Sequence, residues 1–209
     1  MNTIFKPAIL FIIIVALASC GGSKKALTEA LEQQRRDSIA LAKKNKIHPI
    51  QKKYASILNV RPEKISNIKL FEFIDGWMNT PYKLGGEDKS GIDCSFFVQY
   101  IYHDVYDVLI ERTAEKQFNA PDTDRFKGQK YLRQGDLIFF NPQGSEFAPI
   151  THVGFYLGNN KFVHSTARRE TTGPGVKISN LKDPYWQRLF VSAGRKPLKP
   201  EVLNSKLEP

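Results

Sequence analysis

The spacing of apolar residues changes near Gly135, and this change limits the possible folds more than any other feature of the sequence. Before Gly135, apolar residues recur at helical spacing in two stretches, and after it come short apolar runs separated by Gly, Pro and Asn. Helices that precede the strands, instead of alternating with them, are typical of an α+β domain. We therefore predict helices packed on one face of a mainly antiparallel β-sheet, and not a parallel Rossmann-type fold.

Two helices and five strands are expected in this domain. Ser66 is the candidate cap of the first helix, which Pro81 ends. Asp93 is the candidate cap of the second helix, and this places Cys94 in its first turn. The expected strands span residues 137–140, 152–157, 161–165, 176–178 and 190–195.

The N-terminal residues have the pattern of a bacterial export signal. Lys6 precedes an unbroken apolar run from Ala8 to Ala18, which is short compared with the roughly 20 residues of a membrane-spanning helix. Small residues then lead directly to Cys20, as in a bacterial lipobox, whose cysteine is acylated and becomes the first residue of the mature protein. An ordinary secretory signal that ends near a cysteine by chance is the alternative. We predict a signal peptide at residues 1–19 and lipidation of Cys20.

The net charge of +10 is concentrated before the expected domain. Residues 24–69 contain 12 Lys and Arg against 4 Asp and Glu, whereas residues 70–209 contain 18 against 17. A nearly neutral domain does not indicate nucleic-acid binding. We predict a basic, partly helical tether at 20–65, a folded domain at 66–197 and a tail at 198–209. The tether would attract anionic lipids or polymers, although a merely soluble linker is an equally good interpretation.

Cys94 is the remaining cysteine if Cys20 is lipidated, so it cannot form an intramolecular disulfide. A thiol attacks carbonyls as the thiolate, and a helix amino terminus lowers the thiol pKa. The N–H groups at such a terminus have no partner within the helix and can hold an oxyanion. Cys94 is therefore a candidate nucleophile, and a small buried core residue is the alternative.

Two of the four histidines are candidate partners for Cys94. His48 falls in the tether and His103 in the second helix, whereas His152 and His164 fall on adjacent strands. His152 opens its strand and can reach across to a helix end as the base. His164 would then hydrogen-bond the distal ring nitrogen of His152 and fix its tautomer and orientation.

The turn between the two histidine strands decides whether these rings can meet. A two-residue turn at Asn159-Asn160 puts His152 and His164 on opposite faces of the sheet, whereas a three-residue turn that begins at Gly158 puts His164 diagonal to His152 on one face. We therefore predict an odd-numbered loop or a bulge. Spacing alone leaves a catalytic and a structural role open for each residue, because the fold assembles Cys and His partners. The histidine pair lacks an obvious third zinc ligand, so neither a metal nor a cofactor is predicted.

Six sequence blocks occur in order between residues 70 and 196. They are PYKLGG at 81–86, DCS at 93–95, Arg112-Thr113 with Gln117, QGDLIFF at 134–140, HVGFYLG at 152–158 and FVH at 162–164. Together they resemble the NlpC/P60 family of cell-wall cysteine peptidases. The resemblance implies a papain-like α+β core and a catalytic triad of Cys94, His152 and His164.

The resemblance also implies that Tyr82, Asp93 and Ser95 line the substrate cleft, where they bind the peptide or stabilise the oxyanion. One position departs from the family pattern. Phe96 stands where the family usually has Gly, Ala or Ser, and this leaves the shape of the cleft near the nucleophile open.

The implied function is that of a peptidoglycan endopeptidase, which hydrolyses amide bonds of murein stem peptides or of their cross-links. The plan of lipobox, tether and one domain resembles the small murein endopeptidase lipoproteins of Gram-negative bacteria. We expect a monomer, anchored through Cys20, and Gly21 after the cysteine favours the periplasmic face of the outer membrane. A non-catalytic peptidoglycan-binding module and a cysteine-dependent amidase or acyltransferase on the same scaffold remain as alternatives.

Overall fold

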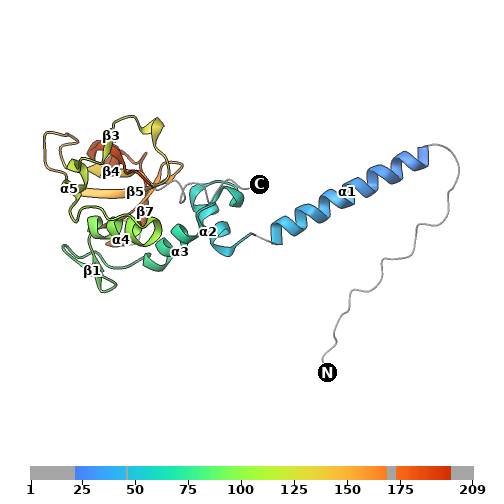
Figure 1. The fold of residues 1–209 in the computed structure, drawn as a ribbon, viewed down its shortest axis with the longest axis horizontal. Helices are drawn as coiled ribbons and strands as arrows, with labels where there is room; N and C mark the ends of the chain where they lie inside the picture. The colour runs from blue at the N-terminus through green and yellow to red at the C-terminus, as the bar shows by residue number, and fades with distance from the viewer. Residues whose placement is uncertain (1–21, 46, 169–172, 199–209) are drawn as a thin grey trace, which may run out of the picture. The chain divides into compact units, whose positions relative to one another are not determined.

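The structure, a computed structural model, describes residues 22–45, 47–168 and 173–198 (Figure 1). The chain divides into a unit that ends at Ile47 and a larger compact unit that begins at His48. The predicted signal peptide and Cys20 lie outside the described residues. The smaller unit contributes one helix, α1 (Gly22–Asn45).

The larger unit combines short helices with two antiparallel sheets. Its elements in chain order are α2 (Pro49–Leu58), η1 (Pro62–Lys64), α3 (Ile68–Trp77), β1 (Glu87–Asp88), β2 (Gly91–Ile92), α4 (Cys94–Tyr106), α5 (Ala114–Asn119), β3 (Asp124–Phe126), η2 (Gln129–Tyr131), β4 (Leu137–Phe140), β5 (His152–Gly158), β6 (Lys161–Thr166), β7 (Gly175–Asn180), α6 (Pro184–Leu189) and β8 (Phe190–Arg195). The α+β class predicted from the sequence is confirmed.

Side chains on helix α1 are exposed from residue 25 to residue 38, where contacts along the helix surface stabilise it. Leu27 and Leu31 are exposed, and Arg36 forms an ion pair with Glu32, one turn away, at 3.3 Å. Such pairs support an isolated helix by a few tenths of a kcal/mol each. Within the described ranges, no helix has the length and apolar character needed to cross a membrane.

Helix α2 belongs to the folded unit, although the sequence analysis assigned it to the tether. Its residues Ile50, Tyr54 and Leu58 are buried in the main core, and the rings of Tyr54 and Phe71 lie 4.7 Å apart. The compact unit therefore begins at His48 and not at residue 66. The basic residues between these apolar positions led to the wrong prediction of a charged linker, although the segment is an amphipathic helix.

Helix α3 is capped by Asn67 and not by Ser66. The Asn67 side chain accepts a hydrogen bond from the N–H of Leu70 at 3.1 Å. Its amide group also donates to the hydroxyl of Tyr106 at 3.2 Å and so links α3 to the end of α4. The Asn67 side chain thus both caps α3 and contacts α4. Leu70, whose N–H it caps, is fully buried.

The larger sheet contains six strands in the order β3-β8-β4-β5-β6-β7, and each neighbouring pair is antiparallel. The strands predicted at 137–140 and 190–195 have the observed bounds. The observed β5 and β6 are each one residue longer than predicted at their ends, and β7 is longer by one residue at its start and two at its end. The short strands β1, β2 and β3 were not predicted, because two or three residues are too few to show an alternating pattern.

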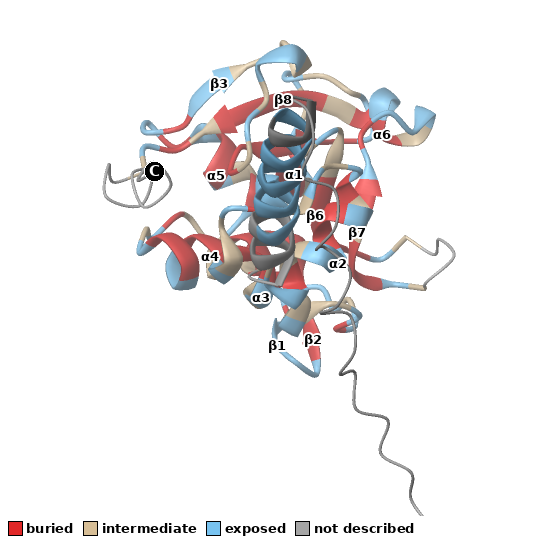
Figure 2. Cartoon of the chain, turned by 90° about the vertical axis from the view of Figure 1, so that its right-hand side faces the viewer, coloured by how far each residue is buried: buried red, intermediate tan, exposed pale blue. Residues whose placement is uncertain are grey.

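The sheet is buried on both faces (Figure 2). Leu137 and Phe139 belong to the core that contains the buried residues of α2, α3 and α4. Ile138 and Phe140, which alternate with them, belong to a second core with Trp186 of α6. The prediction of helices on one face therefore describes the main helices, and the short helix α6 covers part of the other face.

The hairpin between β5 and β6 has the predicted bulge. Phe155 pairs with Val163, but Gly158 pairs with Lys161, so the register shifts by one residue at the turn. Positive φ angles at Gly158, Asn159 and Asn160 make this shift possible, because Gly and Asn tolerate left-handed backbone conformations. The shift brings His152 and His164 to the same face of the sheet, where their rings are hydrogen-bonded.

A substitution at Gly154 tests this packing. A Cβ atom there would lie 2.5 Å from Cδ2 of Phe162, whose ring lies 4.7 Å from the ring of His164. We expect Gly154→Ala to lower the free energy of unfolding by about 1–3 kcal/mol, because overpacking forces buried side chains from their preferred rotamers.

Urea denaturation measures this change, with Gly76→Ala as the control. A Cβ at Gly76, within α3, would meet no atom within 4 Å, so this substitution is expected to stabilise the helix by about 0.5–1 kcal/mol. Equal stability of Gly154→Ala and the native protein would contradict the packing described.

Candidate active site

Cys94 lies in the first turn of α4, directly after Asp93, whose backbone is extended. Asp93 caps the helix as predicted, and its Oδ1 accepts a hydrogen bond from the N–H of Phe96 at 2.7 Å. The N–H of Asp93 donates to the carbonyl of Gly86 at 3.1 Å and so fixes the approach of the chain. Cys94 is therefore the first residue of the helix, where aligned peptide dipoles stabilise negative charge.

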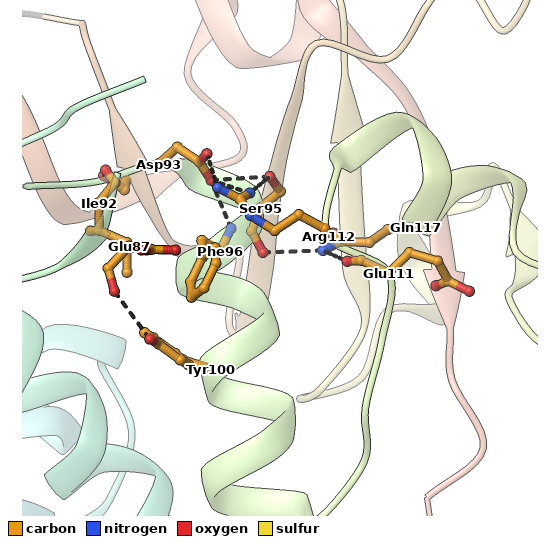
Figure 3. Close-up of polar contacts among 10 residues, drawn as sticks. Glu87, Ile92, Asp93, Ser95, Phe96, Tyr100, Glu111, Arg112 and Gln117 are labelled. Atoms are coloured by element: carbon orange, nitrogen blue, oxygen red, sulfur yellow. Dashed lines mark hydrogen bonds and ion pairs between the residues drawn. The ribbon is translucent and has the colours of Figure 1, made fainter. Parts of the chain in front are cut away.

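A bidentate ion pair holds the Asp93 carboxylate in place (Figure 3). Nη2 of Arg112 lies 2.8 Å from Oδ2 of Asp93, and Nη1 lies 3.1 Å from Oδ1. The hydroxyl of Ser95 donates to Oδ1 at 3.0 Å and accepts from Nη1 of Arg112 at 3.1 Å. The two polar residues that flank Cys94 are thus joined to each other through one guanidinium.

The ring of Phe96 packs beneath this guanidinium. The central carbon of Arg112 lies 4.2 Å from the Phe96 ring centroid, and the same ring packs edge-on against Tyr100 at 4.7 Å. The hydroxyl of Tyr100 donates to the carbonyl of Glu87 at 3.1 Å. Figure 3 shows this stack at the start of α4. The Phe96 ring is therefore accommodated between Arg112 and Tyr100, where it supports the guanidinium.

Gln117 fixes the backbone of the same turn from the other side. Its Nε2 donates to the carbonyl of Ser95 at 3.1 Å and to the carbonyl of Glu111 at 2.7 Å. The side chain is fully buried. Residues 111 and 112 are thereby tied to the nucleophile's helix, so the loop that carries Arg112 keeps its position.

The imidazoles of His152 and His164 form a hydrogen-bonded pair. Nε2 of His152 lies 2.7 Å from Nδ1 of His164, and Nε2 of His164 lies 3.0 Å from the hydroxyl oxygen of Ser179. If Nδ1 of His152 is the unprotonated nitrogen, its Nε2–H donates to His164 and the Nε2–H of His164 donates to Ser179. This chain of donors leaves Nδ1 of His152 able to accept a proton.

Trp186 of α6 packs against both imidazoles. Its ring is stacked on His152 at 5.6 Å with an interplanar angle of 24°, and it meets His164 edge-on at 4.8 Å. His164 is fully buried, whereas His152 is partly exposed. The pair is therefore shielded on its apolar side and open on the side of His152.

Cys94 lies within electrostatic reach of the histidine strand and of Tyr82. The N–H of Val153, which follows His152, acts to lower the Cys94 pKa, and so do the N–H groups of Ser95 and Cys94 itself. Burial raises the pKa of Tyr82, and the electrostatic effects of the nearby Cys94 and Asp93 add to this rise. The predicted residues Tyr82, Asp93, Cys94 and Ser95 are thus neighbours.

Burial favours the neutral forms of both proposed reacting groups. It raises the pKa of Cys94 to about 11, against the opposing effect of the backbone N–H groups, and lowers the pKa of His152 to about 4. It also holds the pKa of His164 well below its usual value, and the charges of His152 and Lys177 add to this effect. At neutral pH the site therefore holds Cys94 as a thiol and His152 as a neutral imidazole.

A groove of about 410 Å³ opens beside His152. Aromatic and small polar side chains form most of its surface. The lining residues are Tyr82, Phe140, Asn141, Pro142, Thr151, His152, Thr166, Ala167, Arg168, Tyr185, Trp186 and Leu189. Such a groove can hold an extended peptide against the imidazole and the Tyr82 hydroxyl.

The remaining histidines lie apart from this arrangement. His48 caps α2 through its ring, and His103 is exposed beside Asp104. Among the described residues, no group of three or more His, Cys, Asp and Glu side chains is arranged to hold a metal ion.

Three supporting residues received no role in the sequence analysis: Arg112, Gln117 and Ser179. Arg112 and Gln117 appeared there only within the family blocks, and their position shortly after the Cys94 helix was the available signal. No sequence signal indicated Ser179, because its contact with His164 depends on the pairing of β6 with β7.

Comparisons with known proteins agree with this geometry. The chain is 37% identical over 119 residues to the probable endopeptidase NlpC homolog of Haemophilus influenzae, and the alignment covers 57% of each protein. It is 40% identical over 116 residues to the murein DD-endopeptidase MepH of Escherichia coli, covering 55% of this chain and 40% of that protein. The chain thus spans about half the length of the curated relatives that it matches.

A crystal structure of a Staphylococcus aureus protein, similar to lipoprotein and of the NLP/P60 family, has the same fold. The TM-score is 0.53 and the sequence identity 26%, with 64% of this chain and 42% of that one covered. The sequence model of the NlpC/P60 family matches residues 79–195, which is more than half of the chain. As its ordered motifs predict, the chain belongs to the NlpC/P60 family.

Proposed function

We propose that the chain is a peptidoglycan endopeptidase that uses Cys94 as nucleophile, His152 as general base and His164 as the group that orients His152. The observation that carries this proposal is the hydrogen bond of 2.7 Å between the two imidazoles, made on a strand whose next residue, Val153, approaches the Cys94 sulfur with its N–H. A buried thiol at a helix start, next to the strand that carries a neutral, oriented imidazole, is suited to act as a nucleophile that the imidazole activates.

The reaction begins when His152 accepts the thiol proton as Sγ of Cys94 attacks an amide carbonyl. The tetrahedral oxyanion is held by backbone N–H groups at the start of α4 and by the hydroxyl of Tyr82. The imidazolium of His152 then gives its proton to the departing amine, and a thioester remains on Cys94. Water, deprotonated by His152, hydrolyses the thioester and restores the thiol.

Asp93 and Ser95 act next to this centre and not within the proton transfer. Arg112 pairs with the Asp93 carboxylate and holds it as the cap of α4, although the Asp93 charge still acts to raise the pKa of Cys94. Ser95 shares the same contacts. Both residues are therefore suited to hold the helix start rigid and to present polar atoms to a bound peptide.

The substrate follows from the relatives and from the groove. One relative is named a murein DD-endopeptidase and another a probable endopeptidase. The aromatic groove beside His152 suits a peptide chain better than a charged polymer. We therefore assign the stem peptides of peptidoglycan, or their cross-links, as the substrate class, with the chain acting as a monomer.

The cell envelope is the location that this substrate requires. Cys20 follows a lipobox-like sequence, and the basic helix α1 between it and the folded unit provides reach and positive charge. We propose a lipid anchor at Cys20 and the periplasmic face of the outer membrane as its site.

Digestion of purified peptidoglycan tests the proposed activity. The native chain is expected to release peptides cut within or between stem peptides, identified by mass spectrometry. Cys94→Ala is expected to reduce the initial rate by at least about a thousandfold, because no other group can form the thioester. His103→Gln, which changes an exposed histidine on the same helix, serves as the matched control and should retain full activity.

The products separate the proposal from its alternatives. Binding of peptidoglycan by the native chain without any cleavage would favour a non-catalytic module. Release of stem peptides from the glycan, or transfer of an acyl group, would favour an amidase or an acyltransferase. An active Cys94→Ala variant would contradict the assigned nucleophile.

Metabolic labelling tests the proposed anchor. Cells that express the full chain with labelled palmitate should incorporate the label, and Cys20→Ala should abolish incorporation while leaving Cys94 intact. Equal labelling of the two chains would contradict lipidation at this residue.

A further inference from the structure

The Glu115 side chain links helix α5 to the chain just before His152. Its Oε2 accepts a hydrogen bond from the N–H of Ile150 at 2.5 Å, and Ile150 is the second residue before His152. Ile150 is buried in the main core, where an N–H group without an acceptor is costly. The Glu115 carboxylate therefore holds this point of the chain in place.

The same short helix also contacts the turn that carries Cys94. Gln117 lies two residues after Glu115, and its Nε2 donates to the carbonyl of Ser95 at 3.1 Å (Figure 3). Residues two apart do not share a face of a helix, so Glu115 and Gln117 contact separate neighbours. Helix α5 thus bridges the segment of the proposed nucleophile and the segment of the proposed base.

The chain enters β5 through two consecutive bonded residues. The N–H of Ile150 is bound by Glu115, and the N–H of Thr151 donates to the carbonyl of Phe140 at 3.1 Å. Phe140 is also the partner of His152 in the pairing of β4 with β5. A displacement of Ile150 would therefore act directly on the start of β5, which carries the imidazole of His152.

The other oxygen of the Glu115 carboxylate has a partner within α5. Its Oε1 accepts from Nδ2 of Asn119 at 2.8 Å, one turn further along the helix. Glu115 also lies in the first turn of α5, where the helix dipole favours a negative charge. Its reach to Ile150, its charge and its contact within the helix are therefore three separable properties.

We propose that Glu115 is a positioning residue that sets the separation between the Cys94 thiol and the His152 imidazole by binding the N–H of Ile150. The inference rests on the proposed function, in which His152 takes the thiol proton. Proton transfer depends steeply on geometry, and a displacement of about 1 Å can lower a rate by about a hundredfold. The effect of Glu115 passes through the backbone of residues 150–152.

Two substitutions separate the reach of the side chain from its charge. Glu115→Gln keeps the length and the accepting oxygen, so it should still bind the N–H of Ile150. Glu115→Asp keeps the charge at the helix start but is one methylene group shorter, so it should lose that bond. Asn119→Ala is the matched control, because it removes the other partner of the same carboxylate.

The first measurement is the rate at which iodoacetamide alkylates Cys94 in the full chain at pH 7. We expect Glu115→Asp to lower this rate by about tenfold to a hundredfold, because His152 no longer takes the thiol proton efficiently. Glu115→Gln and Asn119→Ala should react at close to the native rate. In a chain that carries His152→Gln, Glu115→Asp should have no further effect, because the two residues act through one interaction. General loosening of the fold would instead expose the thiol and raise the rate in both backgrounds.

A native rate in Glu115→Asp, or an equal loss in Glu115→Gln or Asn119→Ala, would overturn the inference. If the native chain and His152→Gln react at the same rate, the proposed function fails instead. The NMR signals of the His152 ring then decide the inference, because they do not depend on a reaction. A shift of these signals in Glu115→Asp that is absent in Glu115→Gln supports it, and equal signals in the two variants overturn it.

Discussion

The hydrogen bond between His152 and His164 depends on the register of one hairpin. A single residue of slip between β5 and β6 would turn His164 toward the opposite face of the sheet, away from His152. The bulge at Gly158 prevents this, and Gly154 leaves room for the Phe162 ring beside the pair. Two glycines, neither of which takes part in the proposed chemistry, therefore determine whether the His152 ring can be oriented.

The nucleophile has an equally specific support on the other side of the site. Asp93 caps the helix that begins with Cys94, and Arg112 compensates its charge. Phe96 carries the guanidinium on its ring, so the unusual side chain at this position is part of the support and not an obstacle in the groove. A partly buried ion pair of this kind contributes more to position than to stability, because desolvation offsets much of the attraction.

Local patterns were sufficient to predict the five strands β4 to β8, the Asp93 cap and the register of the histidine hairpin, since each is determined by nearby residues. They could not identify contacts between distant segments. The packing of Tyr54 in α2, the pairing of Asp93 with Arg112 and the bond from His164 to Ser179 all depend on the assembled fold. The sequence thus predicted the reacting groups and the orienting His164 as candidates, whereas the supporting roles of Arg112, Gln117 and Ser179 emerged only from the structure.

The central claim is that His152 removes the proton of a thiol that burial alone would keep protonated. The rate of Cys94 alkylation by iodoacetamide, followed by mass spectrometry across the pH range, tests it most directly. In the native chain and in His103→Gln the rate should rise as His152 loses its proton near pH 4 and should then level, because the neutral imidazole assists the thiol. In His152→Gln the rate should stay low at neutral pH and rise only toward the thiol pKa of about 11. The same pH dependence with and without His152 would contradict the account.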